Sequence, residues 1–113
     1  MNLEKLASCG IDTKSLLDRF MGNEALIDKF FKKFFLDSNY KNLKASLAIN
    51  DFEKAYECSH TLKGMTGNMS MTLLHNLFCE LTQSIKSKNI KEVSMIMDKI
   101  DYEYQRLYTL IEE

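Results

Sequence analysis

Apolar side chains recur every three or four residues along most of this 113-residue sequence, which is the spacing of amphipathic helices. No strand-like alternation, internal repeat or low-complexity segment interrupts the pattern. Proline is absent and glycine occurs only four times, so few residues can break a helix. The pattern predicts helices over about 12–20, 24–49, 51–69, 71–87 and 90–111.

Residues that cap helices mark several of these boundaries. Asp12 or Thr13 can cap the first helix, Asn23 the second and Ser70 the fourth. The stretch 37–39, Asp-Ser-Asn, either kinks the second helix or interrupts it, and the sequence leaves both alternatives open.

Short connections between long helices favour antiparallel neighbours. We therefore expect an all-α fold, an antiparallel up-and-down four-helix bundle with a short N-terminal covering helix. A chain of this length can form one core but not two, so residues 1–113 are expected to be a single domain. Glu112 and Glu113 are expected to form a solvated tail.

Charge and composition exclude several classes of protein. Lys and Arg number 15 against 16 Asp and Glu, so no strongly basic surface is expected for nucleic acids or anionic membranes. No apolar run approaches the roughly 20 residues that span a bilayer, and the N-terminus lacks a secretory pattern. Cys9, Cys58 and Cys79 lack metal-ligand or CxxC spacing, so we expect reduced thiols and a cytoplasmic location.

His60 stands out because it lies away from the apolar seam of its helix. That seam centres near Ser59 and Thr66, and His60 lies about 130° from its centre, toward solvent. Lys63 and Gly64 follow three and four residues later, one turn along the same side of the helix. Histidine is well suited to phosphoryl transfer near neutral pH.

Gly64 and Gly67 weaken an otherwise strong helix, since each costs about 1 kcal/mol relative to alanine. Bare backbone at Gly64 would let a partner protein reach the His60 imidazole. The Lys63 ammonium could then approach an anionic group on that ring. These residues predict a phosphate-accepting histidine, and their joint presence weighs against the alternative of an exposed histidine without a role.

The segment from Ser59 to Met69, SHTLKGMTGNM, closely resembles the signature of the histidine-containing phosphotransfer (HPt) family. That signature is an H-x-L-K-G helix followed by a small residue and an N-L-G-like step. The similarity also covers residues 10–12, residues 16–23 and the leucine-rich helix after the motif, so it extends over nearly the whole chain. The family fold is a four-helix bundle with a covering N-terminal helix, in agreement with the fold expected from the apolar pattern.

The resemblance implies a histidine phosphocarrier in the multistep phosphorelay of a two-component system. His60 would accept a phosphoryl group from the aspartate of one receiver domain and pass it to another receiver domain. Lys63 would steady the phosphoryl charge, and Gly64 would admit the receiver's active site. The implied partners are receiver domains of response regulators or hybrid sensor kinases. Magnesium would belong to the receiver, and no cofactor or metal is expected on this chain.

The chain departs from the family at two places. Glycine usually stands where this chain has Ser70, which affects how the motif helix ends rather than the chemistry. The family often has an acidic or amide residue on the next helix near the ring, where the alignment places Thr82 beside Gln83. The hydrogen bond that orients the imidazole is either missing or formed by Gln83.

A receiver would dock on a modest apolar patch around His60. Candidates come from the leading helix and the motif helix: Leu17, Phe20, Met21, Tyr56 and Gly67. No glycine-rich loop for ATP and no hydrolase-like set of side chains is present, so we expect a phosphoryl carrier and not an enzyme. His75 lacks a cation and a glycine at the same spacings, so it is interpreted as a boundary residue.

Two other classes remain open. A helical adaptor would bind a receiver domain or a partner helix without phosphotransfer, but it has no reason to retain His60, Lys63 and Gly64 together. A metal-binding bundle would need paired Glu-x-x-His motifs, and only Glu57 and His60 have that spacing. We expect a monomeric, free-standing carrier, whose upstream kinase, downstream regulator and output the sequence does not indicate.

Overall fold

The computed structural model describes residues 2–112, which form seven helices and no strand. The helices are α1 (Leu3–Ser8), α2 (Thr13–Arg19), α3 (Glu24–Leu36), α4 (Ser38–Ala48), α5 (Phe52–Asn68), α6 (Thr72–Lys86) and α7 (Ile90–Glu112). Met1 and Glu113 lie outside the described residues, so of the expected acidic tail only Glu112 is seen, and it is exposed. Among the described helices, none combines the length and the apolar character needed to cross a membrane.

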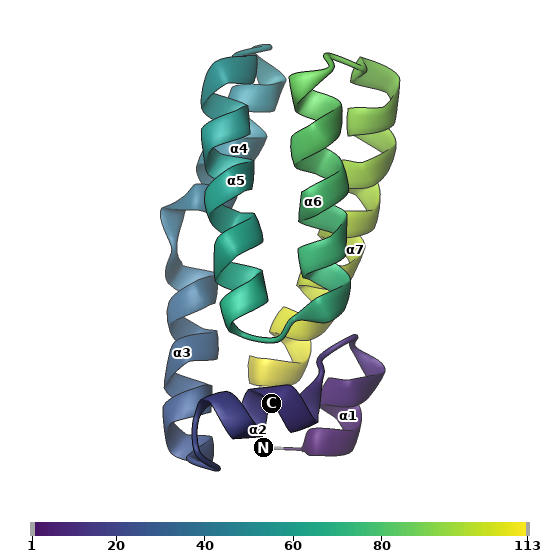
Figure 1. Cartoon of the computed structure of the whole chain (residues 1–113). Coiled ribbons are helices and arrows are strands. Elements are labelled where there is room, and N and C mark those ends of the chain that lie inside the picture. The colour runs from purple at the N-terminus through teal and green to yellow at the C-terminus, as the bar shows by residue number, and fades with distance from the viewer. Residues whose placement is uncertain (1, 113) are drawn as a thin grey trace.

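The long helices lie side by side along an elongated molecule whose Cα atoms extend over 40 × 23 × 21 Å. Helix α5 packs against α4 and α6, α6 also packs against α7, and α3 contacts α7. In Figure 1, α3 and α4 follow one another along one side, while α1 and α2 lie at the end where α5 turns into α6. The short helices therefore lie at the same end of the molecule as the α5–α6 connection.

The long second helix predicted from the sequence is interrupted at Asp37. Its backbone is extended (φ −68°, ψ 135°), so it ends α3, and its carboxylate accepts a hydrogen bond from the Asn39 N–H to begin α4. This decides between the kink and the interruption that the sequence left open. Helix α1 was not predicted, because only Leu6 of its six residues is buried and no periodic pattern results.

Two of the predicted helix starts are confirmed, because the Asp12 and Asn23 side chains accept capping hydrogen bonds from the Ser15 and Leu26 N–H groups. The prediction for Ser70 is wrong, because Met71 is the N-cap residue of α6 and forms no side-chain cap. Ser70 instead has φ +53°, and its hydroxyl is hydrogen-bonded to the Ser15 hydroxyl at 2.9 Å. A left-handed backbone is strained for serine and free for glycine, which explains why glycine would suit this position.

The seam predicted for α5 is buried, and it determines which face of the helix reaches the surface. Ser59, Leu62 and Thr66 are fully inaccessible to solvent. The Thr66 hydroxyl donates to the Leu62 carbonyl, and no buried side-chain nitrogen or oxygen of the described residues lacks a hydrogen-bond partner. With this face fixed in the core, the opposite face of α5 carries His60 to the surface.

Candidate functional site

His60 lies near the middle of α5 and is exposed, as predicted. Its ring is nearly parallel to that of Tyr56, one turn earlier, with ring centroids 6.1 Å apart and an interplanar angle of 10°. Within the described part of the chain, no other side chain is hydrogen-bonded to this ring. The imidazole nitrogens are therefore free to meet an incoming group.

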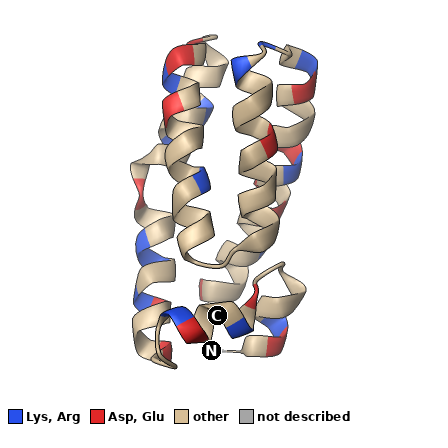
Figure 2. Ribbon diagram, viewed as in Figure 1, with Lys and Arg blue, Asp and Glu red and all other residues tan. Residues whose placement is uncertain are grey.

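Lys63 places an isolated positive charge next to His60. Residues 58–79 contain no Asp, Glu or Arg, and Lys63 is their one Lys. No ion pair engages its ammonium group within residues 2–112. Figure 2 shows how little charge lies on α5 and α6 near the turn that joins them. An anionic group on His60 would thus have one cation, Lys63, three residues after it on α5 and one carboxylate, Glu57, three residues before it.

Gly64 leaves the surface open beside His60. A Cβ built on Gly64 would have no atom within 4 Å beyond its own helix and chain neighbours. Gly64 lies one helical turn after His60, so the bare backbone borders the imidazole. The arrangement can expose a nucleophilic nitrogen to another protein, with a cation at hand and no side chain in the way.

Gly67 has a different role, which the sequence did not reveal. A Cβ at this position would lie 3.1 Å from two atoms of the His75 ring, because His75 packs over Gly67. His75 is half-buried, as expected of a boundary residue, and its Nδ1 donates a hydrogen bond of 2.8 Å to the Lys63 carbonyl. A receiver that docked here would meet the His75 ring and not bare backbone at Gly67.

Thr82 and Gln83, the two candidates for orienting the ring, form no hydrogen bond with it among the described residues. Thr82 is buried and donates to the Phe78 carbonyl at 2.6 Å. Since this uses its one hydroxyl hydrogen, the 2.7 Å bond between Ser59 and Thr82 must be donated by Ser59. Gln83 is exposed, and neither side chain is hydrogen-bonded to His60. The Ser59–Thr82 bond therefore links α5 to α6 at the residue before His60 and leaves the imidazole without a hydrogen bond from either candidate.

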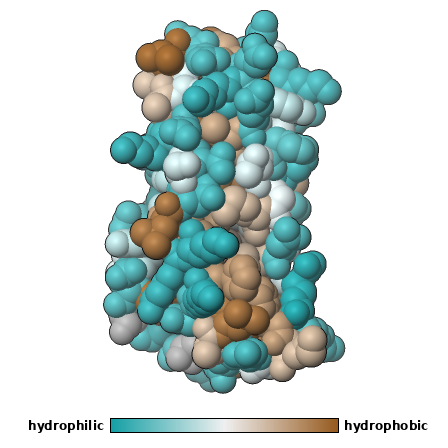
Figure 3. Space-filling view, turned by 90° about the vertical axis from the view of Figure 1, so that its left-hand side faces the viewer, coloured by the Kyte–Doolittle hydropathy of each residue, from teal (hydrophilic) through white to brown (hydrophobic). Residues whose placement is uncertain are grey.

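The docking candidates of the leading helix lie on an apolar surface formed by α2 and α3. Met21 is 93% exposed, while Leu17 and Phe20 are half-buried. The structure adds two partly exposed residues of α3, Leu26 and Phe30, and the Phe30 ring lies 5.5 Å from that of Phe20. We call these five residues the α2–α3 apolar surface. Figure 3 shows apolar atoms gathered at the lower end of the side that α3 occupies.

A groove of about 250 Å³ connects this surface with α5. Phe30 lines it from α3, and Met65 and Asn68 line it from α5. Asn68 lies one turn beyond Gly64, so the groove opens beside the bare stretch of the motif helix. Exposed imidazole, open backbone and apolar groove are thus neighbours on one side of the molecule.

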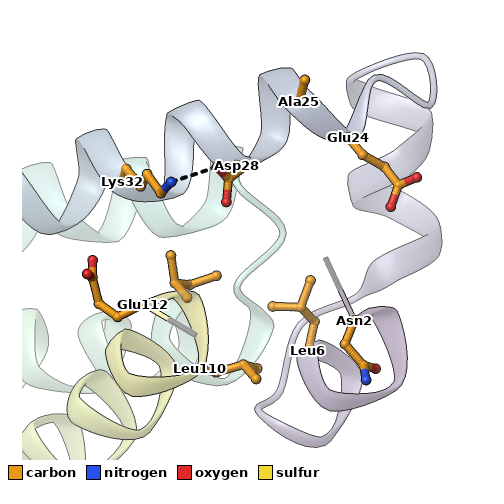
Figure 4. A pocket seen from close by; sticks show the side chains of 9 residues that line it. Asn2, Leu6, Glu24, Ala25, Asp28, Lys32, Leu110 and Glu112 are labelled. Atoms are coloured by element: carbon orange, nitrogen blue, oxygen red, sulfur yellow. Dashed lines mark ion pairs between the residues drawn. The ribbon is translucent and has the colours of Figure 1, made fainter.

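A larger cavity of about 620 Å³ lies between α1, α3 and the end of α7, as Figure 4 shows. Asp28 and Lys32 form an ion pair of 3.0 Å along its wall, and Glu24 and Glu112 also line it. None of the site residues predicted from the sequence belongs to this cavity. No group of three or more His, Cys, Asp or Glu side chains in residues 2–112 is arranged to hold a metal ion.

No family model, curated protein or solved structure matches this chain. The case for a function therefore comes from the motif of α5, its geometry and its surroundings.

Proposed function

We propose that this protein is a histidine phosphocarrier of a multistep phosphorelay. His60 accepts a phosphoryl group from the aspartyl phosphate of one receiver domain and passes it to the aspartate of another. One observation carries the proposal: on a single face of α5, the exposed imidazole of His60 adjoins the Lys63 ammonium group and the open backbone of Gly64, and residues 2–112 offer neither the ring a hydrogen bond nor the ammonium an ion pair. The resemblance of the segment from Ser59 to Met69 to the HPt signature supports the same function.

The chemistry asks little of this chain. A ring nitrogen of His60 forms the N–P bond while the O–P bond to the receiver's aspartate breaks, and the reverse exchange loads the next receiver. Such transfers depend on positioning and on neutralising phosphoryl charge. Lys63 provides one positive charge in a stretch that is otherwise uncharged. The receiver provides its aspartate and magnesium, so the chain needs no cofactor and acts as a carrier without kinase activity of its own.

The fold suits this function as an antiparallel four-helix bundle. In this description α3 and α4 form one interrupted rod beside α5, α6 and α7, and α1 with α2 covers the end of the bundle. The interhelical contacts of α5 with α4 and α6, and of α6 with α7, support the arrangement. A rigid bundle would hold His60 at a fixed height above the receiver's catalytic aspartate.

Docking would place a receiver domain, from a response regulator or a hybrid sensor kinase, over the exposed face of α5. The groove lined by Phe30, Met65 and Asn68 and the α2–α3 apolar surface would contact its apolar rim. Tyr56 would contribute from the other side of His60, against whose ring it lies. We expect the carrier to act as a monomer in the cytoplasm.

The decisive experiment is phosphoryl transfer from a phosphorylated receiver domain to the wild-type chain and to His60→Gln. Acid-labile, base-stable label is expected on the wild type and absent from His60→Gln. His75→Gln is the matched control, since it removes the other histidine and should retain the label. Label that persists in His60→Gln would assign the phosphoryl group to another residue and contradict the proposal.

A non-catalytic adaptor is the second candidate, and one observation favours it. Neither Thr82 nor Gln83 is hydrogen-bonded to the His60 ring, whereas a carrier gains from an oriented imidazole. Measurable binding to a receiver domain, with no label on His60 from any of several phosphorylated receivers, would support the adaptor and overturn the carrier.

A further inference from the structure

Cys79 and His75 form a second pair of reactive side chains on the α5–α6 hairpin. Both belong to α6, and Cys79 Sγ lies 3.6 Å from His75 Nε2. Residues four apart are neighbours on one face of a helix, so α6 itself holds the pair together. The proposed phosphotransfer chemistry uses neither side chain.

The hydrogen bond to Lys63 determines which nitrogen of His75 carries the proton. Nδ1 must donate, because its partner at 2.8 Å is a carbonyl oxygen. The neutral ring therefore has its lone pair on Nε2, which faces the thiol of Cys79. Thiol, base and a group that orients the base form the arrangement in which proteins activate cysteine.

Solvent access separates Cys79 from the other two cysteines. Cys9 and Cys58 are only 8% and 5% exposed, whereas Cys79 is half-buried. Burial raises the pKa of the Cys58 thiol, which keeps that thiol in its unreactive protonated form. Cys79 alone among the three combines access with a base at its sulfur.

We propose that Cys79 is a modification site, at which a hydroperoxide oxidises a thiol activated by His75. The proton moves from Cys79 Sγ to His75 Nε2, and the thiolate attacks one peroxide oxygen as the O–O bond breaks. The sulfur is oxidised to a sulfenic acid and the peroxide is reduced. The leaving hydroxide, or alkoxide for an organic peroxide, takes the proton from His75, which restores the neutral imidazole.

Two contacts place this thiol beside the candidate phosphoacceptor. His75 meets Lys63 one turn before Cys79 on α6, and Thr82 meets Ser59 about one turn after it. Cys79 therefore lies alongside the turn of α5 that carries His60. If the proposed function holds, oxidation adds a polar group at the edge of the receiver's docking face. The oxidation itself does not depend on that function.

The test exposes the reduced full-length chain to limiting hydrogen peroxide with dimedone, which traps sulfenic acids, and reads each cysteine by mass spectrometry. Cys79 is expected to be labelled at least about tenfold faster than Cys9 and Cys58. His75→Asn keeps an N–H for the Lys63 carbonyl but offers no base, so it should slow Cys79 labelling about tenfold. Asn76→Ala, at the next and exposed position of α6, is the matched control and should leave the rate unchanged.

Equal rates of Cys79 labelling in wild type and His75→Asn would overturn the proposal, as would labelling spread evenly over the three cysteines of the wild type. Should His75→Asn loosen the fold, Cys9 and Cys58 would become reactive as well. His75→Gln then serves as the second variant, since it also keeps an N–H and offers no base. Labelling of Cys79 about tenfold slower than in the wild type supports activation by His75, and an unchanged rate overturns it.

Discussion

The Ser59 hydroxyl donates a hydrogen bond of 2.7 Å to the Thr82 hydroxyl, and this bond joins α5 to α6 at the residue before His60. The Thr82 hydroxyl in turn donates a hydrogen bond to the Phe78 carbonyl, so the two hydroxyls form a chain of hydrogen bonds with one direction. Both side chains are buried. This chain of polar groups adds a directional link to the apolar packing between α5 and α6.

The direction of that chain predicts unequal effects of two substitutions. Thr82→Val leaves the buried Ser59 O–H without an acceptor, and we expect a loss of about 1–3 kcal/mol in the free energy of unfolding. Ser59→Ala leaves Thr82 bonded to Phe78 and should cost less, about 0.5–1.5 kcal/mol. Urea unfolding of both variants and of the double variant measures this. Equal single losses that simply add in the double variant would contradict the assigned direction.

Gly64→Ala is expected to stabilise the protein and to impair its proposed function. Beyond its own helix and chain neighbours, no atom of residues 2–112 lies within 4 Å of the added Cβ, so the gain in helix propensity, about 1 kcal/mol, should appear in urea unfolding. The same methyl group would obstruct the approach of a receiver and slow phosphoryl transfer. Gly67→Ala is the matched control for stability, because its Cβ presses on the His75 ring at 3.1 Å. It should be less stable than Gly64→Ala by about 1 kcal/mol.

Lys63→Gln should slow phosphoryl transfer to His60 about tenfold, which corresponds to about 1.4 kcal/mol of activation free energy. The reason is the loss of the one cation in an uncharged stretch of chain. The rate of label transfer from a phosphorylated receiver measures it, with Lys99→Gln on α7 as the control for net charge. Comparable rates in both variants would mean that Lys63 does not act on the phosphoryl group.

Met21→Ala should weaken receiver binding while leaving stability within about 0.5 kcal/mol of wild type. Met21 is 93% exposed, so its removal disturbs no packing within the chain. Titration calorimetry with a receiver domain that transfers phosphoryl groups measures the affinity. Ile90→Ala is the control, since Ile90 is 59% exposed and begins α7, away from the α2–α3 apolar surface. If both substitutions weakened receiver binding equally, the α2–α3 apolar surface would not be the docking surface.

The raised pKa of Tyr40 makes the stability of the protein depend on pH. Burial, and then its hydrogen bond and proximity to Asp101, raise the pKa of Tyr40 above the ordinary value of 10.0. The unfolded chain therefore loses this proton first, so the free energy of unfolding should fall as the pH rises above about 10. Tyr40→Phe should flatten that decline. Urea unfolding measures the free energy of unfolding from about pH 9 to about pH 11, roughly one pH unit on either side of the ordinary tyrosine pKa. Tyr102→Phe, which alters a tyrosine that is 66% exposed, is the control for the loss of a tyrosine hydroxyl.

The sequence predicted the parts of the site that follow from periodicity within one helix. The exposure of His60 and the burial of Ser59 and Thr66 follow from the spacing along α5, which tertiary contacts did not override. The open surface at Gly64 also follows, because it depends on the same face of the same helix.

Contacts between helices could not be predicted in this way. Nothing in the spacing around His75 indicates that its ring crosses to Gly67 and the Lys63 carbonyl, since that depends on the register of α6 against α5. Serine is a common N-cap residue, but Ser70 has a left-handed backbone and does not cap α6. The tight α5–α6 connection requires that backbone conformation. The partners of Thr82 could not be predicted either, because its hydroxyl is hydrogen-bonded to Ser59 on another helix as well as to the Phe78 carbonyl.

The isolation of Lys63 has a consequence for how a loaded carrier differs from an empty one. Without a phosphoryl group, the stretch from 58 to 79 carries a single positive charge. A phosphoryl group brings a charge of about −1.5 to −2, so the same stretch would become net negative. Loading would thus reverse the sign of the charge that this stretch contributes to the docking face. A partner that favours the empty form and a partner that favours the loaded form could then be told apart by charge alone, without any change in the shape of the bundle.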